Sequence, residues 1–566
     1  MSSKRPKLLI VGLDGATYDV IRPWAGELPA LNRFLDAGAH GPLRSAVPPI
    51  TAPAWTSFMT GMNPGKHGLY NFIEPQPGSY GVRYSNARSR RTRSLWQLLS
   101  DAGLSVGTVN VPMTYPPEEV AGYVVSGLDA PESSTAITHP PELYTELRSE
   151  FGEVSPQFRH LGYLNSDERR DHLLDRLREI DAHYVRLTRH LIETRPTDVV
   201  MVVFTSTDTI QHFFFHYLDP AHPQHPGEAA PERYRNAVRD VYRRLDSAIA
   251  ELSELVAPDG LVAVVSDHGF RSTSGRVVHM NQLLAELGLL HYRREPAPKR
   301  ALNRLLRGVD RLVRSNLTPT QKGRLAALLP SLRRKWEKQL IGLTGVDWAR
   351  TRAFCYENLT VPPSIWLNRK GDFPHGIVEP GEAYDELVAT LTAELLAVPD
   401  PVTGKPLITA VHRREELYQG PFLAHAPDLT PAWWDGVGFV SQAGRDFPAA
   451  VEMAGPGPLG AGDWGGTHAI DGIVGLAGAG VRPGAALDGA DITDVVPTLL
   501  YWLGLPIPED IDGAVRRDAF TAELLASRGE PRTGPPSGQS GGADATYSDA
   551  EAREVEQRLR DLGYLS

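Results

Sequence analysis

The sequence has almost no cysteine and no long apolar run. Its 566 residues include one cysteine, Cys355, which excludes an internal disulfide framework and a zinc site built on thiolates. Any metal site therefore has to be built from Asp and His side chains. The longest apolar stretches, such as DVVMVVF from Asp198, are shorter than the roughly 20 residues of a membrane-spanning helix. We therefore expect no transmembrane span.

The N-terminus also lacks the pattern of a secretory signal. MSSKRPKLLIVGLDG has a basic cluster but passes at once into a strand-like run, with no small-residue cleavage site behind it. We therefore expect a cytoplasmic protein, in agreement with the scarcity of cysteine. The formal net charge of -10 argues against general nucleic-acid affinity, so no nucleic-acid polymer is expected as a partner. The oligomeric state stays open.

Strand-like and helix-like segments alternate from Lys7 to about residue 280. KLLIVGL, LSVGTVNV, EVAGYVVSG, DVVMVVFTS and GLVAVVS are typical of buried strands, because Val, Leu and Ile dominate them. TRSLWQLLSDAG and the stretch from Ser166 to Glu193 have helical patterns. This alternation predicts an α/β fold of three layers, with a central, largely parallel sheet flanked by helices.

Candidate metal ligands follow three of the predicted strands. Asp14 comes after LLIVGL, Asp208 after DVVMVVFTS, and Asp267 after AVVS. One Asp behind an apolar run is more often a helix cap or a turn residue. Open α/β sheets, however, bind their ligands at the carboxyl ends of the strands. We therefore expect these three carboxylates to converge on one cleft.

Three histidines extend this set. His212 is four residues after Asp208, so one helical turn brings both side chains to the same face. His268 directly follows Asp267 at the end of its strand, and His468 lies in the glycine-rich loop GDWGGTHAIDG. Imidazole nitrogens and carboxylate oxygens without thiolates suit zinc, manganese or iron.

The region between His268 and His468 has a different character. From Arg293 to Lys338 the chain has fourteen Lys or Arg and three acidic residues, with apolar residues at helical spacing. The interpretations are a solvated helical insertion, a lid over an anionic substrate, or a weak contact with anionic lipid or RNA. A mixed α+β segment follows, and we interpret the whole region as an inserted α+β cap that shapes the substrate pocket.

These observations suggest five segments. Residues 1–288 and 421–525 form the two parts of a catalytic core, and residues 289–420 form the cap. Residues 526–547 are rich in Gly, Pro and Ser, which predicts a disordered linker. Residues 548–566 start with an N-cap signal and form a short amphipathic helix that docks on the body.

A further motif begins at Thr51. The segment TAPAWTSFMTGMNPGKHG, from Thr51 to Gly68, matches T-x-P followed by T-G-x-x-P-x-x-H-G. With the Asp and His residues above, it resembles the type I phosphodiesterase/nucleotide pyrophosphatase branch of the alkaline phosphatase superfamily. The resemblance covers residues 7–280 and 460–505, and it implies an alkaline-phosphatase-like core.

The resemblance also implies a site. One divalent ion would take Asp208, His212 and His468, and a second would take Asp14, Asp267, His268 and the Thr51 oxygen. Both ions would most readily be Zn²⁺, with Mn²⁺ or Fe as alternatives. Thr51 would attack phosphorus and form a covalent phospho-threonine. Asn71, one residue short of the family's spacing, is the candidate to hold a phosphate oxygen, while His67 would be structural.

The expected activity is hydrolysis of phosphodiester or pyrophosphate bonds in a small phosphorylated substrate. A sulfatase is disfavoured, because Trp55 stands where that branch needs an Arg. The alternatives are a phosphomonoesterase, a phosphonate hydrolase or a phosphomutase, and more remotely a noncatalytic protein that binds a phosphorylated ligand or an anionic surface. The candidates for further anion binding, against a plain surface role, are Lys66, Arg88, Arg90 and Arg91.

Overall fold

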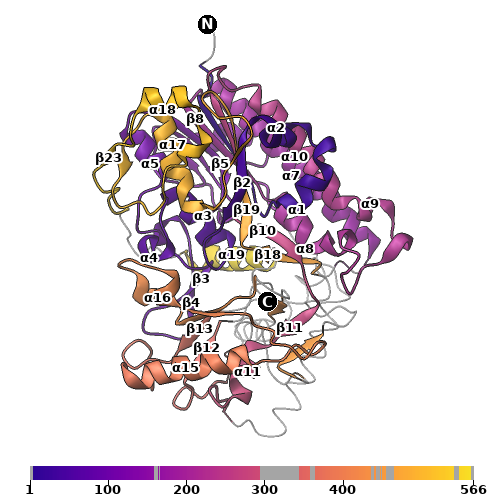
Figure 1. The fold of residues 1–566 in the computed structure, drawn as a ribbon, viewed down its shortest axis with the longest axis vertical. Coiled ribbons are helices and arrows are strands. Elements are labelled where there is room, and N and C mark those ends of the chain that lie inside the picture. The colour runs from indigo at the N-terminus through magenta and orange to yellow at the C-terminus, as the bar shows by residue number, and fades with distance from the viewer. Residues whose placement is uncertain are drawn as a thin grey trace.

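The computed structural model shows a large upper part around one central sheet and a smaller lower part around α15 (Figure 1). It describes residues 4–158, 164, 166–293, 343, 345–356, 364–434, 439–441, 447, 449–453, 464–540 and 547–561. The basic segment from Arg293 to Lys338 lies outside these residues, apart from Arg293 itself. Its predicted helix is therefore not described.

The central sheet has ten strands. In spatial order they are β20 (Ala485–Ala486), β2 (Ala39–Arg44), β19 (Asp471–Gly478), β9 (Leu261–Val265), β1 (Leu8–Leu13), β8 (Val199–Phe204), β5 (Val106–Val111), β6 (Gly122–Ser126) and β7 (Thr138–His139), with β21 (Ala490–Asp491) beside β2. The run from β9 to β6 is parallel, whereas β19 is antiparallel to both of its neighbours. The predicted α/β fold with a largely parallel sheet is confirmed.

Helices cover both faces of this sheet (Figure 1). One layer contains α2 (Pro29–Ala37), α7 (Asp167–Thr194) and α10 (Ala237–Ser253), and the other contains α3 (Thr51–Thr60), α5 (Leu95–Asp101) and α17 (Val495–Leu503). Because both faces are covered, every residue of β1, β5, β8 and β9 is buried. No helix within the described ranges is both long enough and apolar enough to cross a bilayer.

The structure contains further helices and strands. The helices are α1 (Tyr18–Ile21), α4 (Pro64–His67), α6 (Leu143–Phe151), α8 (Ser206–Leu218), α9 (Glu232–Arg235), α11 (Met280–Glu286) and α16 (Arg414–Leu417). The strands are β3 (Ile73–Pro75), β4 (Val82–Tyr84), β10 (Gly269–Ser272), β11 (Arg276–Val278), β16 (Phe439–Ser441), β17 (Val451–Met453) and β18 (Gly466–Ala469). Of these, α8 and β18 carry predicted ligands, and β10 begins directly after His268.

The lower part contains an antiparallel sheet and one long helix. The sheet is formed, in spatial order, by β12 (Ala353–Cys355), β13 (Ile365–Leu367), β15 (Leu429–Pro431) and β14 (Val411–Arg413), and α15 (Glu382–Leu396) lies in the same part. This part therefore contains both helix and strand. Because β15 pairs with β13 and β14, a boundary at residue 420 would divide one sheet.

The C-terminal region departs from the predicted linker. Within residues 526–540, α18 (Ala522–Arg528) ends, and β23 (Thr533–Gly534) pairs with β22 (Ile507–Pro508). Ser537 also donates two hydrogen bonds of 2.7 Å to the carboxylate of Asp510. Composition suggests disorder here because Gly, Pro and Ser lower local propensity, but it says nothing of these contacts with residues 507–510. Residues 541–546 lie outside the described residues.

Candidate metal and nucleophile site

The predicted ligands lie at one edge of the central sheet. Asp14 directly follows β1, Asp208 lies in the first turn of α8 just after β8, and Asp267 follows β9. These parallel strands are neighbours in the sheet, so their carboxyl ends meet. All three carboxylates are buried. The expectation that they converge on one place is therefore met by the topology.

A strand pair brings His468 to the same place. β10 runs from Gly269 and pairs antiparallel with β18, so that Phe270 stands opposite His468. Two glycines let β18 approach α8 closely. A Cβ at Gly466 would lie 2.7 Å from the backbone oxygen of Gln211, and one at Gly465 would lie 2.6 Å from the backbone nitrogen of His216. Packing therefore requires Gly465 and Gly466 just before His468.

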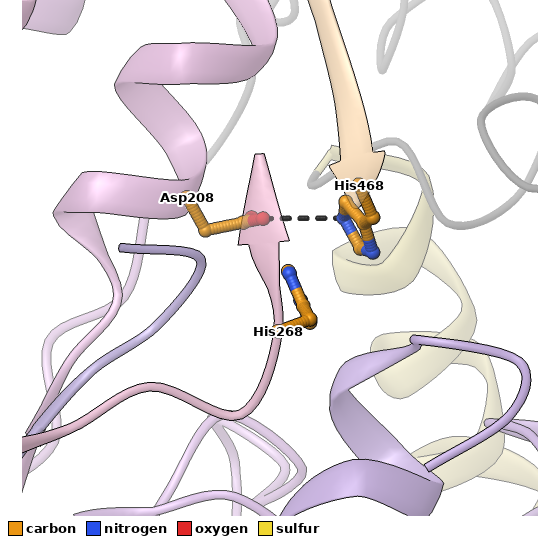
Figure 2. Close-up of side chains that lie close together, drawn as sticks. All are labelled: Asp208, His268 and His468. Atoms are coloured by element: carbon orange, nitrogen blue, oxygen red, sulfur yellow. Dashed lines mark ion pairs between the residues drawn. The ribbon is translucent and has the colours of Figure 1, made fainter. Parts of the chain in front are cut away.

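Asp208, His212 and His468 form a compact group. Asp208 Oδ1 lies 3.2 Å from His468 Nε2 and 3.3 Å from His212 Nε2, and the two Nε2 atoms are 3.0 Å apart. Ligands placed tetrahedrally about 2.0–2.2 Å from a zinc ion are roughly 3.3–3.6 Å from one another. Figure 2 shows Asp208, His268 and His468 pointing toward a common centre. The group has the spacing of a metal site.

A second group adjoins the first. His268 Nε2 lies 3.4 Å from Asp14 Oδ1 and 3.4 Å from Asp267 Oδ2. Candidate ligand atoms of His268 also lie within 4.8 Å of those of Asp208 and His468. The rings of His268 and His468 stack with their centroids 3.7 Å apart. Two ligand sets therefore share one buried cluster.

The three imidazoles make the same kind of hydrogen bond through Nδ1. Each presents Nδ1 to a backbone carbonyl oxygen: Gly466 at 3.2 Å for His212, Gly269 at 3.0 Å for His268 and Pro49 at 2.7 Å for His468. Nδ1 therefore carries the proton, and the lone pair of Nε2 faces the cluster. Such carbonyl contacts are the usual support of metal-binding histidines. Without a cation, the facing lone pairs of His212 and His468 would repel.

The electrostatics of the cluster also favour a cation. Burial, together with the carboxylates of Asp267 and Asp208, raises the pKa of Asp14 well above its ordinary range. Burial likewise raises the pKa of Asp267 and lowers the pKa of His268. Among the described residues, no donor serves Asp14 Oδ1, Asp267 Oδ2 or His268 Nε2. Buried carboxylates are costly unless they are paired or coordinate metals, so the donor set fits divalent cations.

Asp208 behaves differently from the other two carboxylates. Burial alone would raise its pKa, but when the imidazoles of His212 and His468 are protonated, their charge outweighs burial and lowers the pKa of Asp208 below its ordinary range. This carboxylate therefore stays ionised next to the two rings. Its negative charge adds to the cation-binding character of the first group.

Thr51 is the first residue of α3 and is fully buried. Contacts on both sides of it reach the cluster. Pro49 O, two residues earlier, accepts from His468 Nδ1, and Trp55 Nε1, one helical turn later, donates to Asp14 Oδ2 at 3.1 Å. These contacts bring the start of α3 next to both ligand groups.

A family model of type I phosphodiesterases/nucleotide pyrophosphatases matches residues 8–446. The chain belongs to this family. It is therefore a hydrolase that acts on phosphoric esters, in the alkaline phosphatase superfamily. No protein with a curated description matches it.

Solved structures resemble this family member at low identity. Human ectonucleotide pyrophosphatase/phosphodiesterase 5 is 13% identical, with 91% of this chain and 100% of that chain covered and a TM-score of 0.47. The murine protein in complex with AMP has 13% identity, the same coverages and a TM-score of 0.48. Phosphonoacetate hydrolase from Sinorhizobium meliloti 1021, in complex with phosphonoacetate, has 15% identity, coverages of 87% and 95%, and a TM-score of 0.46.

The remaining residues of the family motif have other partners. His67 is buried, shares a hydrogen bond of 3.0 Å with Ser57 Oγ through Nε2, and accepts from the backbone N–H of Leu69 at 3.2 Å, in agreement with a structural role. Asn71 lies just before β3, and its Oδ1 accepts from the neighbouring backbone N–H of Phe72 at 2.7 Å.

Two of the candidate anion-binding cations are tied into the fold. Lys66 Nζ lies 2.5 Å from Asp512 Oδ1 and donates to the carbonyl of Asp510. Arg90 is buried and pairs with Glu118. Both side chains are therefore committed to structural ion pairs. Sequence reasoning gave no sign of these partners, because Lys66 and Asp512 are far apart in the chain.

Proposed function

We propose that the protein is a metal-dependent hydrolase that cleaves phosphodiester or pyrophosphate bonds, with Thr51 as its nucleophile. One observation carries this proposal. Three imidazole Nε2 atoms and three carboxylates meet in a buried cluster, with ligand spacings of 3.0–3.4 Å, beside the start of the helix that carries Thr51. Membership of the phosphodiesterase family supports the same activity.

Two divalent ions would be held by this cluster. Asp208, His212 and His468 would hold one, and Asp14, Asp267 and His268 would hold the other, next to Thr51. The donor set suits Zn²⁺ best, with Mn²⁺ or Fe as alternatives. When bound, such ions make a hydroxyl more acidic and neutralise charge on a phosphoryl group.

The chain's own residues would carry the covalent steps. The Oγ1 of Thr51 attacks phosphorus, and the alcohol or nucleotide departs with its oxygen, leaving a phospho-threonine. Water then attacks phosphorus and breaks its bond to Oγ1, which releases a phosphate monoester that keeps the other ester group and returns a proton to the threonine hydroxyl. Because Thr51 begins α3, the N–H groups of the first turn and the helix dipole favour an anionic phosphoryl group there. We keep Asn71 as a candidate for a further oxygen contact.

The substrate class is a small phosphorylated molecule rather than a polymer. The cytoplasm remains our proposed location, on the ground of the single cysteine. Phosphomonoesters and phosphonates are the competing substrates, since the same two ligand sets would also serve them. They are separated by the kinetic comparison that closes the Discussion.

The proposal predicts the effects of two substitutions. Thr51→Ala should lower turnover of an aryl phosphodiester at least about 10⁴-fold, because the nucleophile is lost. Its metal content should stay unchanged, because Asp14, Asp267 and His268 remain to hold the ion. Asp267→Ala should lower both turnover and metal content, because it removes a metal ligand. Turnover is measured by release of the aryl alcohol, and metal content by elemental mass spectrometry.

Thr56→Ala is a matched control. Thr56 is buried in the same helix, and its hydroxyl donates to the backbone carbonyl of Ala52. This variant should keep turnover within a few-fold of the unmodified enzyme. Near-normal hydrolysis by the Thr51→Ala protein would contradict the covalent mechanism.

A further inference from the structure

A tryptophan joins the nucleophile helix to one of the metal ligands. Trp55 lies four residues after Thr51 in α3, so both side chains are on the same side of the helix. Its Nε1–H donates to Asp14 Oδ2 at 3.1 Å, and both side chains are buried. The contact is specific, because it joins an indole N–H to one carboxylate oxygen.

That hydrogen bond leaves the other oxygen of Asp14 for the cluster. Oδ1 has no donor among the described residues and lies 3.4 Å from His268 Nε2. The backbone of Asp14 is held separately: its N–H donates to Phe204 O at 3.0 Å, and its carbonyl accepts from Thr207 Oγ1 at 2.6 Å. With the backbone fixed in this way, the indole determines which carboxylate oxygen faces the ion position.

The fold makes room for this indole. A Cβ at Gly12, two residues before Asp14, would lie 2.6 Å from Trp55 Cη2 and 2.8 Å from Val203 Cγ2. A side chain at this position of β1 would therefore displace the ring. The glycine lets the indole lie against β1 and reach the carboxylate at the end of the same strand.

Burial alone does not account for the contact. Trp96, in α5, is also buried, yet its Nε1 has no acceptor among the residues that the structure describes. This fold therefore accommodates a buried indole without a carboxylate partner. The hydrogen bond of Trp55 is therefore not simply a consequence of packing an indole into the core.

We propose that Trp55 is a positioning residue that orients Asp14 to bind the ion held with Asp267 and His268. It also links the helix of Thr51 to that ion's ligand Asp14, so that the nucleophile and the metal position are fixed relative to each other. The inference rests on the proposed function, because it requires that this group of side chains binds a cation.

The test is metal affinity rather than activity. Metal-free protein is titrated with Zn²⁺ in competition with a chromophoric chelator, for the unmodified chain, Trp55→Phe and Trp96→Phe. Loss of a supporting hydrogen bond typically lowers metal affinity about 10- to 100-fold. We expect that loss at one of the two sites in Trp55→Phe, with the other site unchanged. Trp96→Phe, which removes the same indole from another buried position, should bind both ions normally.

A shape-preserving replacement covers the case in which Trp55→Phe is poorly folded. Benzothienylalanine at position 55 keeps two fused rings and replaces only the N–H by sulfur, and it should reproduce the loss at one site. Normal affinity at both sites in this protein, or equal losses in Trp55→Phe and Trp96→Phe, would overturn the inference. Failure of the unmodified protein to bind two ions would instead contradict the proposed function.

Discussion

At the scale of single residues, His67 is held as a neutral ring inside the protein. Burial, with a smaller effect of Arg90, lowers the pKa of its imidazole to about 3. Nδ1 accepts from Leu69 N–H, so Nε2 carries the proton and donates to Ser57 Oγ. The ring thereby joins α3 to the residues after α4, and a charged imidazole would not fit these contacts.

This arrangement predicts acid sensitivity. The folded pKa is below the unfolded value of about 6.5, so the stabilisation is complete above pH 6.5 and is lost as the pH falls from there toward 3, by about 1.4 kcal/mol per pH unit. Between pH 7.5 and 5.0, the metal-free protein should lose about 2 kcal/mol more free energy of unfolding than the His67→Gln variant. Urea unfolding at both pH values measures this difference. Equal losses would show that His67 does not contribute.

The candidate metal ligands could be predicted from the sequence, but the side chains that hold them in place could not. Asp14, Asp208 and Asp267 each follow an apolar run, so the strand-end rule marks them without coordinates. Trp55 gave no such signal, because its carboxylate partner is 41 residues away. Lys66 was a candidate for anion binding, but its ion pair with Asp512 depends on a loop that only the folded chain brings near.

At the scale of helices and strands, α19 (Asp549–Asp561) docks on loops at the carboxyl ends of the parallel strands. Arg558 is buried, and its Nη1 donates to Leu128 O at 2.8 Å and also to Ala130 O. Tyr547, just before the helix, donates to Asp129 O at 2.9 Å and stacks on Tyr115. The C-terminal helix therefore braces the loops that follow β5 and β6.

Arg558 is the residue whose loss should release this helix. Arg558→Ala leaves two buried carbonyls without their donor and should lower the free energy of unfolding by about 2–4 kcal/mol. Arg553, exposed on the same helix, supplies the control, and its replacement by Ala should change stability by less than about 0.5 kcal/mol. Urea unfolding compares the two variants. Similar values for both would mean that docking of α19 contributes little.

Elements with a strong pattern of their own could be predicted, and elements defined by their partners could not. The five Val-, Leu- and Ile-rich runs became β1, β5, β6, β8 and β9, because strands buried on both faces need apolar residues throughout. In contrast, β23 is two residues long and owes its place to β22. The same applies to β15, which completes a sheet beyond the predicted limit of the cap.

At the scale of the whole molecule, the cluster ties folding to metal binding. Its carboxylates come from the residue after β1, from α8 and from the turn after β9, and they are buried together. An ion that binds only the folded chain stabilises it by about 2.7 kcal/mol per site at a hundred times its dissociation constant. Zn²⁺ should therefore raise the thermal midpoint of chelator-treated protein, and Asp267→Ala should reduce that rise. Differential scanning fluorimetry would contradict this account if midpoints in chelator and in Zn²⁺ coincided.

The most direct measurement of the central claim is the ratio of kcat/KM for an aryl phosphodiester to that for the matching aryl phosphomonoester. Both are assayed with Zn²⁺- and Mn²⁺-loaded enzyme, with Thr51→Ala as the blank. The account predicts a ratio well above one, because two ions and Thr51 suffice for a diester, and the Lys66 and Arg90 side chains are committed elsewhere. A ratio well below one would contradict it and make a phosphatase or mutase the better interpretation.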